Sequence, residues 1–230
     1  MSLFFDATHL PQPASEYVAW IDVMGTQSSM SRSLNATANF IFKLHSAALQ
    51  AATGSIRLYP VMDGLYAAGS AQSQMLDFLR SVFQQVAEEF NQTQVAHHRF
   101  IIRGALAFGP VIHGADVSAQ ASTVLASNLD YRRAILLGMP MVQAHLSEAS
   151  APPFGISVHD SARVFAPPGH QPLHAIWWSW RNTANQETWL ALKPALMQHL
   201  QWCSERSMSI GYPADRLKEH QEMVRQLFAQ

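Results

Sequence analysis

The chain contains little cysteine, little lysine and little charge. Its single cysteine, Cys203, excludes an internal disulfide and a zinc site built on several cysteines, and it fits a reducing compartment. Charged residues make up 13% of the 230 residues and the formal net charge is −1, so the sequence lacks the basic field that holds nucleic-acid backbones. Only three of the fifteen cations are lysine, and the excess of arginine slightly favours contacts with carboxylate or phosphate oxygens.

Long apolar runs, repeats and a leader-like start are also missing. No stretch approaches the ~18 consecutive apolar residues that a membrane-spanning helix needs. Residues 1–15 have neither a basic start nor a long apolar segment, so they do not resemble a signal peptide. We therefore expect a soluble, cytoplasmic protein with no membrane partner and no nucleic-acid partner. Its 48% of hydrophobic residues is enough for a sizeable core.

The spacing of apolar residues predicts an α+β fold, because strand and helix patterns are mixed along the first two thirds of the chain. In chain order we expect a strand over 17–21, a helix over 29–52, a hairpin with strands over 56–62 and 65–68 around an Asp63-Gly64 turn, and a helix over 71–92. There follow a strand over 99–108 that Gly109-Pro110 breaks before a continuation over 111–114, a helical stretch over 131–147 with a boundary near Gly138, and a strand over 154–158.

The composition changes after residue 168, where tryptophans become frequent. We expect a first domain over 1–168 and a helical, Trp-rich extension over 169–230 that packs on it, with helices over 187–205 and 214–229. Tryptophans at this density are most often anchors of a core or an interface. One functional alternative is therefore an interaction protein that docks a partner through this extension.

Two carboxylates are predicted to lie at one edge of the sheet. Asp22 directly follows a buried run of five residues, where a charge needs a partner, a cap or a metal. Asp63 lies in the predicted hairpin turn, and a purely structural turn role is its alternative because Asp-Gly is a common turn sequence. Two converging carboxylates would form a hard oxygen site for Mg²⁺ or Mn²⁺ with nucleotide phosphates.

The segment after Asp22, residues 23–29 (VMGTQSS), connects the first strand to a helix. Its glycine permits a sharp bend, and the amides at a helix start attract anions. The segment is not a Walker loop, because the required lysine is absent. The alternative interpretation is an ordinary helix start with Thr26 or Ser28 as its cap.

Four segments follow one another in a characteristic order: WIDVMGT (20–26), YPVMDGLYAA (59–68), IIRGALAFGPVIHG (101–114) and GMPMVQAHLSE (138–148). In that order they resemble four parts of the class III nucleotidyl cyclases, the family of adenylate and guanylate cyclases. These parts are the first strand with its metal aspartate and phosphate-binding turn, the hairpin with the second metal aspartate, a strand pair, and the helix that follows it. The resemblance covers roughly residues 17–160. It implies a ferredoxin-like antiparallel sheet covered by helices, working as a head-to-tail homodimer with shared active sites.

This resemblance also implies a role for each matching residue. Asp22 and Asp63 would be the ligands of two divalent metal ions, Mn²⁺ or Mg²⁺, with the backbone carbonyl of Val23 also contributing. Amides near Met24, Gly25 and Thr26 would hold the triphosphate. Metal ions at this place would lower the pKa of the ribose 3′-hydroxyl and neutralise the charge of the departing pyrophosphate.

The sequence departs from the purine cyclases at the positions that read the base and the ribose. Tyr59 stands where those enzymes have a base-reading lysine or glutamate, and residues 134–137 lack the partner aspartate or cysteine. Val142 and Leu146 stand at or near the asparagine and arginine that orient the ribose and stabilise the transition state. A tyrosine offers a ring for stacking, one hydroxyl and bulk, which suits a smaller base.

The shortened motifs resemble the bacterial pyrimidine cyclases of the Pycsar anti-phage systems. This implies a uridylate cyclase that converts UTP to 3′,5′-cyclic UMP and pyrophosphate, a second messenger sensed by a separate effector protein. The preference for UTP rests on overall likeness and on no particular residue. The alternatives are a cytidylate cyclase that makes cyclic CMP and a catalytically inactive nucleotide-binding regulator, which Val142 and Leu146 suggest.

Arg103 is the first candidate for the cation that stabilises the transition state, because it lies in the strand that resembles the family's dimer-facing pair. Arg132, Arg133 and Arg163 are alternatives. A structural ion pair with a neighbouring acid is an equally good interpretation of an arginine inside an apolar strand.

Three histidines are possible metal ligands. His97 and His98 are adjacent, and adjacent residues of a strand point to opposite faces, so we interpret both as surface residues. His113 is interpreted as a core residue.

Overall fold

The computed structural model describes residues 5–229, apart from the side chain of Gln27. The first four residues of the N-terminal stretch discussed above lie outside this described part. Within it, no helix combines the length and the apolar character that crossing a membrane requires.

The described chain forms seven strands and ten α-helices, with three short 3₁₀ turns. The strands are β1 (Ala14–Val23), β2 (Arg57–Val61), β3 (Gly64–Gly69), β4 (Ile102–His113), β5 (Leu136–Leu137), β6 (Ile156–Val158) and β7 (Trp177–Trp178). The helices are α1 (Thr26–Met30), α2 (Leu34–Ala51), α3 (Gln72–Gln92), α4 (Thr123–Ser127), α5 (Leu129–Arg133), α6 (Met139–Glu148), α7 (Asp160–Val164), α8 (Gln186–Ser204), α9 (Ser207–Ile210) and α10 (Ala214–Leu227). The 3₁₀ turns are η1 (Ala7–His9), η2 (Ala96–His98) and η3 (Gly114–Asp116).

The sheet has the strand order β2-β3-β1-β4-β6-β7, and β5 pairs with the end of β4. Its first four strands are antiparallel, with α2 between β1 and β2 and α3 between β3 and β4, which is the ferredoxin-like arrangement. The predicted α+β fold is therefore confirmed. One strand departs from the antiparallel pattern, because β6 runs parallel to β4, with Gly104 opposite Ile156.

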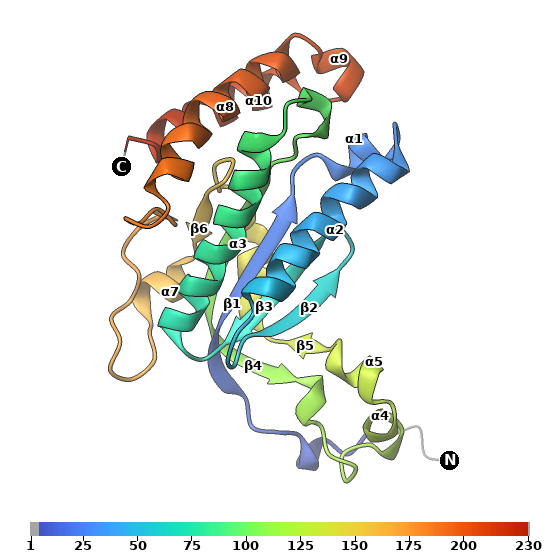
Figure 1. The fold of residues 1–230 in the computed structure, drawn as a ribbon. Helices are drawn as coiled ribbons and strands as arrows, with labels where there is room; N and C mark the ends of the chain where they lie inside the picture. Colours follow the sequence, from blue (N-terminus) through green and yellow to red (C-terminus); the bar gives the residue numbers. More distant parts are fainter. Residues whose placement is uncertain (1–4, 230) are drawn as a thin grey trace.

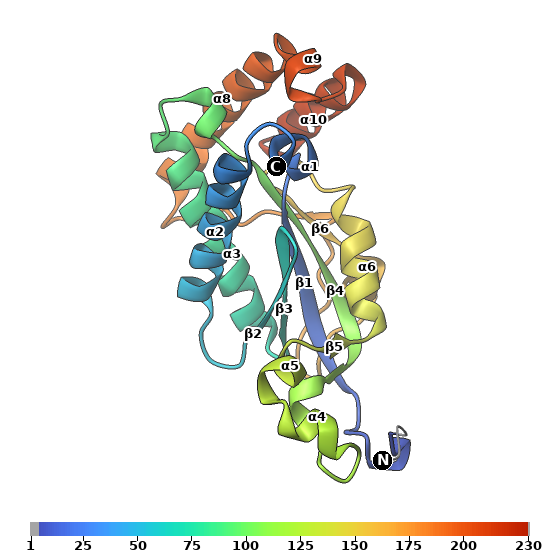
Figure 2. The same ribbon diagram turned by 90° about the vertical axis from the view of Figure 1, so that its right-hand side faces the viewer.

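The sheet lies between two layers of helices. Figure 2 shows α2 and α3 on one face of the sheet and α6 on the other, and Figure 1 shows α8 beside α3. Alternate residues of β1 serve the two sides: Tyr17, Ala19 and Ile21 join the large core beneath α2 and α3, while Val18 and Trp20 join a smaller core beneath α6. Asp22 continues the second row, so the alternation directs it to the α6 face.

The helix predicted over 29–52 is divided in two. The short α1 ends at Met30, and the main helix α2 begins at Leu34, because the Ser33 side chain accepts a hydrogen bond from the Ala36 amide at 3.3 Å. The proposed caps, Thr26 and Ser28, do not cap this main helix. The stretch predicted as one helix over 131–147 is also divided, into α5, β5 and α6, at the predicted Gly138 boundary.

The predicted break at Gly109-Pro110 is wrong. Strand β4 runs through this dipeptide, with Ser15 of β1 opposite Pro110, because β1 is long enough to pair with β4 on both sides of it. Pro110 is exposed, in the kind of strand position where a missing amide is tolerated.

The Trp-rich extension adds to the same sheet and core. Its Trp177 and Trp178 form β7, which pairs with β6. Trp180 and Trp189 are 0% and 3% exposed and pack edge to face, with ring centroids 4.9 Å apart. The indole Nε1 of Trp180 donates to the carbonyl of Phe154 at 2.9 Å. These two rings therefore anchor a core, and the division of the chain at residue 168 stays a prediction.

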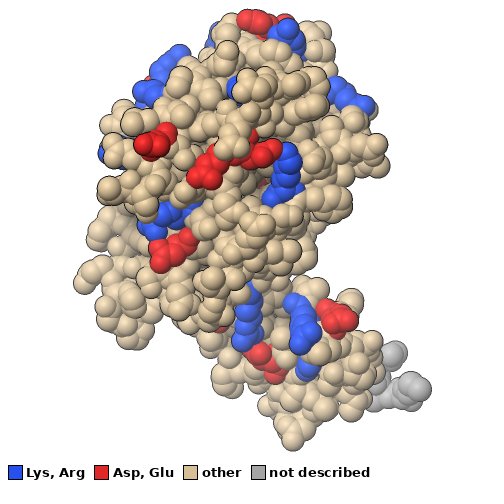
Figure 3. All heavy atoms as spheres, in the orientation of Figure 1, with Lys and Arg blue, Asp and Glu red and all other residues tan. Residues whose placement is uncertain are grey.

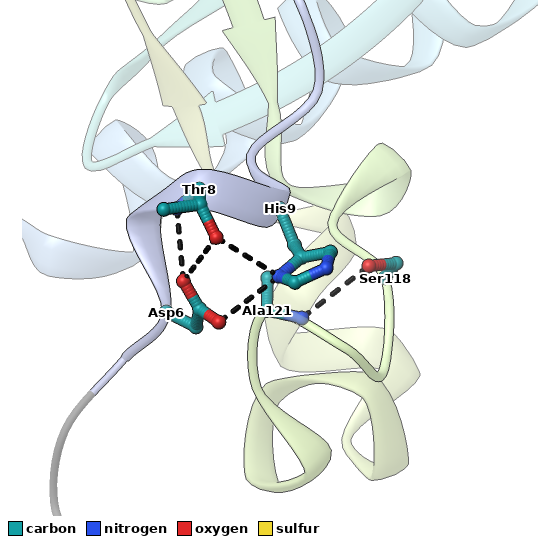
Figure 4. A network of polar contacts seen from close by, with 5 residues as sticks. All are labelled: Asp6, Thr8, His9, Ser118 and Ala121. Carbon is teal, nitrogen blue, oxygen red and sulfur yellow. Dashed lines mark hydrogen bonds and ion pairs between the residues drawn. The ribbon is translucent and has the colours of Figure 1, made fainter.

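Residues 6–9, which form η1 and its cap, lie against the arm formed by η3, α4 and α5, at the end of the sheet opposite α1 and α9 (Figures 1 and 2). The Asp6 amide donates to the carbonyl of Ala121 at 2.9 Å. The Asp6 carboxylate accepts from the amide and hydroxyl of Thr8 at 3.0 and 2.6 Å and lies 3.0 Å from Nδ1 of His9 (Figure 4). On the face in Figure 3, both signs of charge are interspersed in a mostly uncharged surface.

Candidate active site

Asp22 is the penultimate residue of β1 and lies opposite Arg103 of β4 in the strand register. Its Oδ1 is buried and has no hydrogen-bond partner among the described residues. A buried carboxylate oxygen without a donor is costly, so this atom is suited to a cation or to a proton.

Asp63 reaches the same edge of the sheet through the β2–β3 hairpin. The two turn residues are Met62 and Asp63, because Val61 pairs with Gly64, so the predicted Asp63-Gly64 turn is displaced by one residue. Gly64 belongs to β3 and lies against β1: a Cβ there would be 2.5 Å from the carbonyl oxygen of Ile21. This close approach, which only glycine permits, brings Asp63 beside Asp22.

The two carboxylates interact electrostatically. Burial, together with the neighbouring charges of Asp63 and Glu148, raises the pKa of Asp22 from 3.8 to about 7, against the opposing effect of Arg103. A second carboxylate near a buried one disfavours its ionisation, as does the lost hydration. Without a bound cation, the site therefore holds a proton on Asp22 more firmly than an ordinary aspartate does.

The loop after β1 is connected to this pair. The Thr26 hydroxyl, which is buried, donates to the carboxylate of Asp63. Gly25 has a left-handed φ of +77°, and nothing among the described residues lies within 4 Å of where its Cβ would be, so its backbone is open to an approaching group. The Met24 amide already donates to the carbonyl of Ile101 at 2.8 Å, so it is not available for the phosphate contact expected of it.

Arg103 forms a buried ion pair with Glu148 of α6. Its Nε donates to the Glu148 carboxylate, and the two side chains are 15% and 8% exposed. Burial raises the pKa of Glu148, and the guanidinium opposes that rise. The geometry is that of the structural ion pair weighed above for Arg103, and its transition-state role stays a prediction.

The donor set fits hard divalent cations. Asp22 and Asp63 offer carboxylate oxygens, Asp22 has an oxygen without a partner, and a hydroxyl and backbone carbonyls lie close by, which is the oxygen chemistry that Mg²⁺ and Mn²⁺ accept. Among the described residues, no group of three or more His, Cys, Asp or Glu could by itself hold a metal ion. Such ions commonly bind through one or two carboxylates together with substrate phosphates.

Tyr59 is on the same face of the sheet but is not part of this cluster. It is 3% exposed, and its hydroxyl is hydrogen-bonded to Nδ1 of His113, whose Nε2 lies 3.0 Å from the carboxylate of Glu16. Burial raises the pKa of Tyr59 to about 12. Neither the ring face nor the hydroxyl is open to a base in this conformation, which leaves bulk as the property that Tyr59 contributes.

The remaining sequence candidates lie apart from the aspartates. Arg133 and Arg163 pair with acids within their own short helices, and Arg132 donates to the carbonyl of Val117 in the arm. His97 and His98 are exposed as predicted, although they occupy the 3₁₀ turn η2 rather than a strand.

Sequence reasoning missed the contributions of three side chains at the site. The sequence indicates Glu148 only as the last residue of the 138–148 segment, yet an arginine inside an apolar strand requires such an acid. The resemblance assigned only the Thr26 amide a role, with the triphosphate, whereas in the structure the Thr26 hydroxyl contacts Asp63. His145, one turn before Glu148 on α6, packs edge to face on Trp20 with centroids 5.3 Å apart, and no sequence signal separates it from a surface histidine.

Comparison with known proteins gives matches to solved structures only; no protein-family model and no curated protein matches the chain. The chain is similar to the guanylyl cyclase domain of the RhoGC fusion protein from the aquatic fungus Blastocladiella emersonii, with 15% identity, 66% of this chain and 85% of that chain covered, and a TM-score of 0.47. It is also similar to the guanylate cyclase domain of RhGC from Catenaria anguillulae in complex with GTP, with 17% identity, coverages of 64% and 79%, and a TM-score of 0.45.

A third similar structure is a bacterial light-regulated adenylyl cyclase, with 13% identity, 64% of this chain and 44% of that chain covered, and a TM-score of 0.49. These are likenesses of chain arrangement at low identity. The reaction proposed below does not rest on them.

Proposed function

We propose that the chain is a metal-dependent nucleotide cyclase. The observation that carries the proposal is the convergence of Asp22 and Asp63 at one sheet edge, where Asp22 keeps a buried oxygen without a partner. The order of the four sequence segments supplies the reaction type, and the contacts among these residues supply a site suited to it.

The proposed reaction is an intramolecular displacement on a ribonucleoside triphosphate. The ribose 3′-oxygen loses its proton and attacks the α-phosphorus, a new phosphorus–oxygen bond forms, and the bond from the α-phosphorus to the bridging oxygen breaks as pyrophosphate leaves. Divalent metal ions, when bound, lower the pKa of the 3′-hydroxyl and neutralise charge on the pyrophosphate.

The residues of this chain bind and orient the reactants. Asp22 and Asp63 would hold the metal ions together with the carbonyl of Val23. Thr26 fixes Asp63 by its hydroxyl, and the exposed backbone around Gly25 would lie along the triphosphate. Arg103 would have to leave Glu148 to act as the transition-state cation; if it does not, that cation would come from a second chain or from the metal ions.

We propose UTP as the substrate, with CTP as the closest alternative. The likeness of the motifs to the pyrimidine cyclases supports UTP, and the bulk of buried Tyr59, fixed by His113, would limit the depth of the base pocket. We further propose that cyclic UMP acts on a separate effector protein in anti-phage defence, in the cytoplasm.

A homodimer is proposed because α6 presents an apolar stripe to solvent. Met139, Val142 and Leu146 follow helical spacing and are 62%, 49% and 71% exposed. A stripe of this kind favours association with an apolar surface. Val142→Glu or Leu146→Glu should shift the protein to monomers in light scattering, whereas Leu49→Glu, a substitution on α2 at 69% exposure, should not. A wild-type monomer at micromolar concentration would contradict the dimer.

The same stripe favours a second candidate function, a nucleotide-binding regulator without turnover. Val142 and Leu146 expose hydrocarbon where cyclases of the resembling family place an asparagine and an arginine. A regulator would bind a nucleoside triphosphate with Mn²⁺ and form no cyclic product.

The test is incubation of the purified protein with each of the four ribonucleoside triphosphates and Mn²⁺, followed by mass analysis. We expect cyclic UMP from UTP, and loss of product in Asp22→Ala and Asp63→Ala. Asp130→Ala is the matched control, because the Asp130 side chain is fully exposed and lies away from the site. Retained activity in both site variants would refute the metal assignment, and binding without product would favour the regulator.

A further inference from the structure

The C-terminal extension contacts the loop after β1 through the last residue of α9, Ile210, and the residues that follow it. Arg32 donates from Nη1 to the carbonyl of Ile210 at 2.7 Å, and the Ser28 hydroxyl lies 3.5 Å from the carbonyl oxygen of Gly211. These contacts join residues more than 170 positions apart in the chain. Figures 1 and 2 agree in placing α1 beside the α9–α10 end of the extension.

The contact is close at Gly211. This residue is left-handed, with φ +65°, and a Cβ there would lie 2.8 Å from Oγ and 3.3 Å from Cβ of Ser28. A Cβ atom does not approach other atoms so closely, so a side chain at position 211 would force the Ser28 hydroxyl to rotate away or push the two segments apart. Residues 210–212 therefore pack closely against residues 24–33. We call these two stretches the 210–212 segment and the 24–33 loop.

The 210–212 segment is itself held firmly. The Tyr212 amide donates to the carbonyl of Ser207 at 3.2 Å, and the Tyr212 hydroxyl is hydrogen-bonded to Nδ1 of His220 on α10. Burial raises the pKa of Tyr212 and lowers that of His220 to about 4, so the phenol is the donor and the neutral imidazole the acceptor. Leu217 and Val224 of the same helix lie in the main core.

The 24–33 loop has little support of its own. Its only helix, α1, has five residues, and helices this short have almost no intrinsic stability. Its position therefore depends on contacts from outside, which are the Met24 amide with the Ile101 carbonyl, Thr26 with Asp63, Ser29 with the Thr37 hydroxyl at 2.7 Å, and the contacts with the 210–212 segment.

We propose that the 210–212 segment of the C-terminal extension positions the 24–33 loop for catalysis, with Arg32 and Gly211 as positioning residues. This inference rests on the proposed function, in which that loop lies along the triphosphate. The extension thereby gains a role in the reaction although it supplies no group that touches substrate.

Gly211→Ala tests the contact, with Gly169→Ala as the matched control. Gly169 is also left-handed, at φ +83°, but nothing among the described residues lies within 4 Å of where its Cβ would be. Both variants carry the same backbone cost, and only Gly211→Ala presses on the loop. In the ligand-free protein we expect faster hydrogen exchange at amides of the 24–33 loop in Gly211→Ala only.

Kinetics and a compensating variant complete this test. We expect kcat/KM with UTP and Mn²⁺ to fall roughly 10-fold or more in Gly211→Ala, towards the 10²-fold loss that a 1 Å misplacement costs. Adding Ser28→Ala, which removes the atom at 2.8 Å, should restore most of the loss. Equal behaviour of Gly211→Ala and Gly169→Ala, or no recovery in the double variant, would overturn the positioning role.

A variant of Arg32 separates positioning from a direct charge effect on phosphate. Arg32→Ala removes the donor to the Ile210 carbonyl, so amides of the 24–33 loop should exchange faster in the ligand-free protein, and kcat/KM should fall. A fall in kcat/KM with unchanged hydrogen exchange would indicate a charge effect and would overturn the positioning role of Arg32. Calorimetry of the binding of inorganic tripolyphosphate with Mn²⁺ distinguishes failure of this inference from failure of the proposed function. If the wild-type protein neither converts UTP nor binds tripolyphosphate, the proposed function fails. Hydrogen exchange in the ligand-free protein still tests the contact between the two segments.

Discussion

Replacing Asp22 with asparagine should stabilise the protein in the absence of metal and inactivate it. Asparagine keeps the size of the side chain and removes the charge that burial and Asp63 make costly. Because the folded state raises the pKa of Asp22 from 3.8 to about 7, it binds the proton more tightly than the unfolded state does. The stability that comes from this protonation is complete below pH 3.8 and is lost as the pH rises through 7.

The magnitude follows from these two pKa values. Relative to low pH, linkage gives a loss of folding stability from Asp22 of about 4 kcal/mol at pH 8 and about 2 kcal/mol at pH 5. The difference between the two pH values, about 2–3 kcal/mol, is the useful quantity, because any effect of the amide that does not depend on pH cancels. For a chain of this length it corresponds to a change in Tm of roughly 5–10 °C.

Thermal unfolding of wild type and Asp22→Asn, with chelator and with Mn²⁺, at pH 5 and pH 8, measures this quantity. With chelator, the stability of the variant relative to wild type should be greater at pH 8 than at pH 5 by the amount above. Mn²⁺ at pH 8 should stabilise wild type and have little effect on the variant. A variant whose Tm differs from that of wild type equally at both pH values would refute the electrostatic reasoning, and equal Mn²⁺ shifts would refute the metal assignment.

Three further predictions concern the rest of the molecule. Met62 has a left-handed φ of +54°, so Met62→Gly should increase the free energy of unfolding by about 1 kcal/mol and raise Tm by roughly 2–4 °C in calorimetry. A lower Tm would contradict backbone strain at the turn. Glu148→Met should cost about 3 kcal/mol by leaving Arg103 unpaired, and Arg103→Met with Glu148→Met should recover most of it in urea unfolding. Cyclase activity in that double variant would exclude Arg103 as the transition-state cation. Burial lowers the pKa of His199 from 6.5 to about 4, so on acidification the unfolded state takes up the proton before the folded state does. The contribution of neutral His199 to folding stability is therefore complete above pH 6.5, and about 2 kcal/mol of it is lost at pH 5. Between pH 7 and pH 5, His199→Phe should lose about 2 kcal/mol less folding stability than wild type does. An equal loss in both proteins would contradict the role of His199 in this pH dependence.

Apolar periodicity predicted the main elements because each has one face in a continuous core. The helix expected over 71–92 is α3, and the strand expected over 17–21 is the buried part of β1. The pattern failed where a single residue decides the backbone. Ser33 separates α1 from α2 by capping the second, and the close approach of Gly64 to β1 moves the hairpin turn onto Met62 and Asp63.

The candidate site was predictable in part. A charge behind a buried strand identifies Asp22, and an Asp in a tight hairpin identifies Asp63. Contacts between segments distant in the chain carry no local signal, which is why the partner of Arg103 remained open among several acids and why the contact of Arg32 with Ile210 was not predicted.

The charges at this edge of the sheet explain why the site requires cations from outside. Within the described part of the chain, Asp22, Asp63 and Glu148 face one guanidinium, that of Arg103, which leaves two negative charges uncompensated when all the acids are ionised. A nucleoside triphosphate adds more negative charge and would be repelled. Divalent ions on the two aspartates reverse that repulsion, because they compensate the carboxylates and the phosphates together. Substrate and metal should therefore bind cooperatively: the affinity for inorganic tripolyphosphate should rise steeply with Mn²⁺ in calorimetry, and equal affinity with and without the metal would contradict this account of the site.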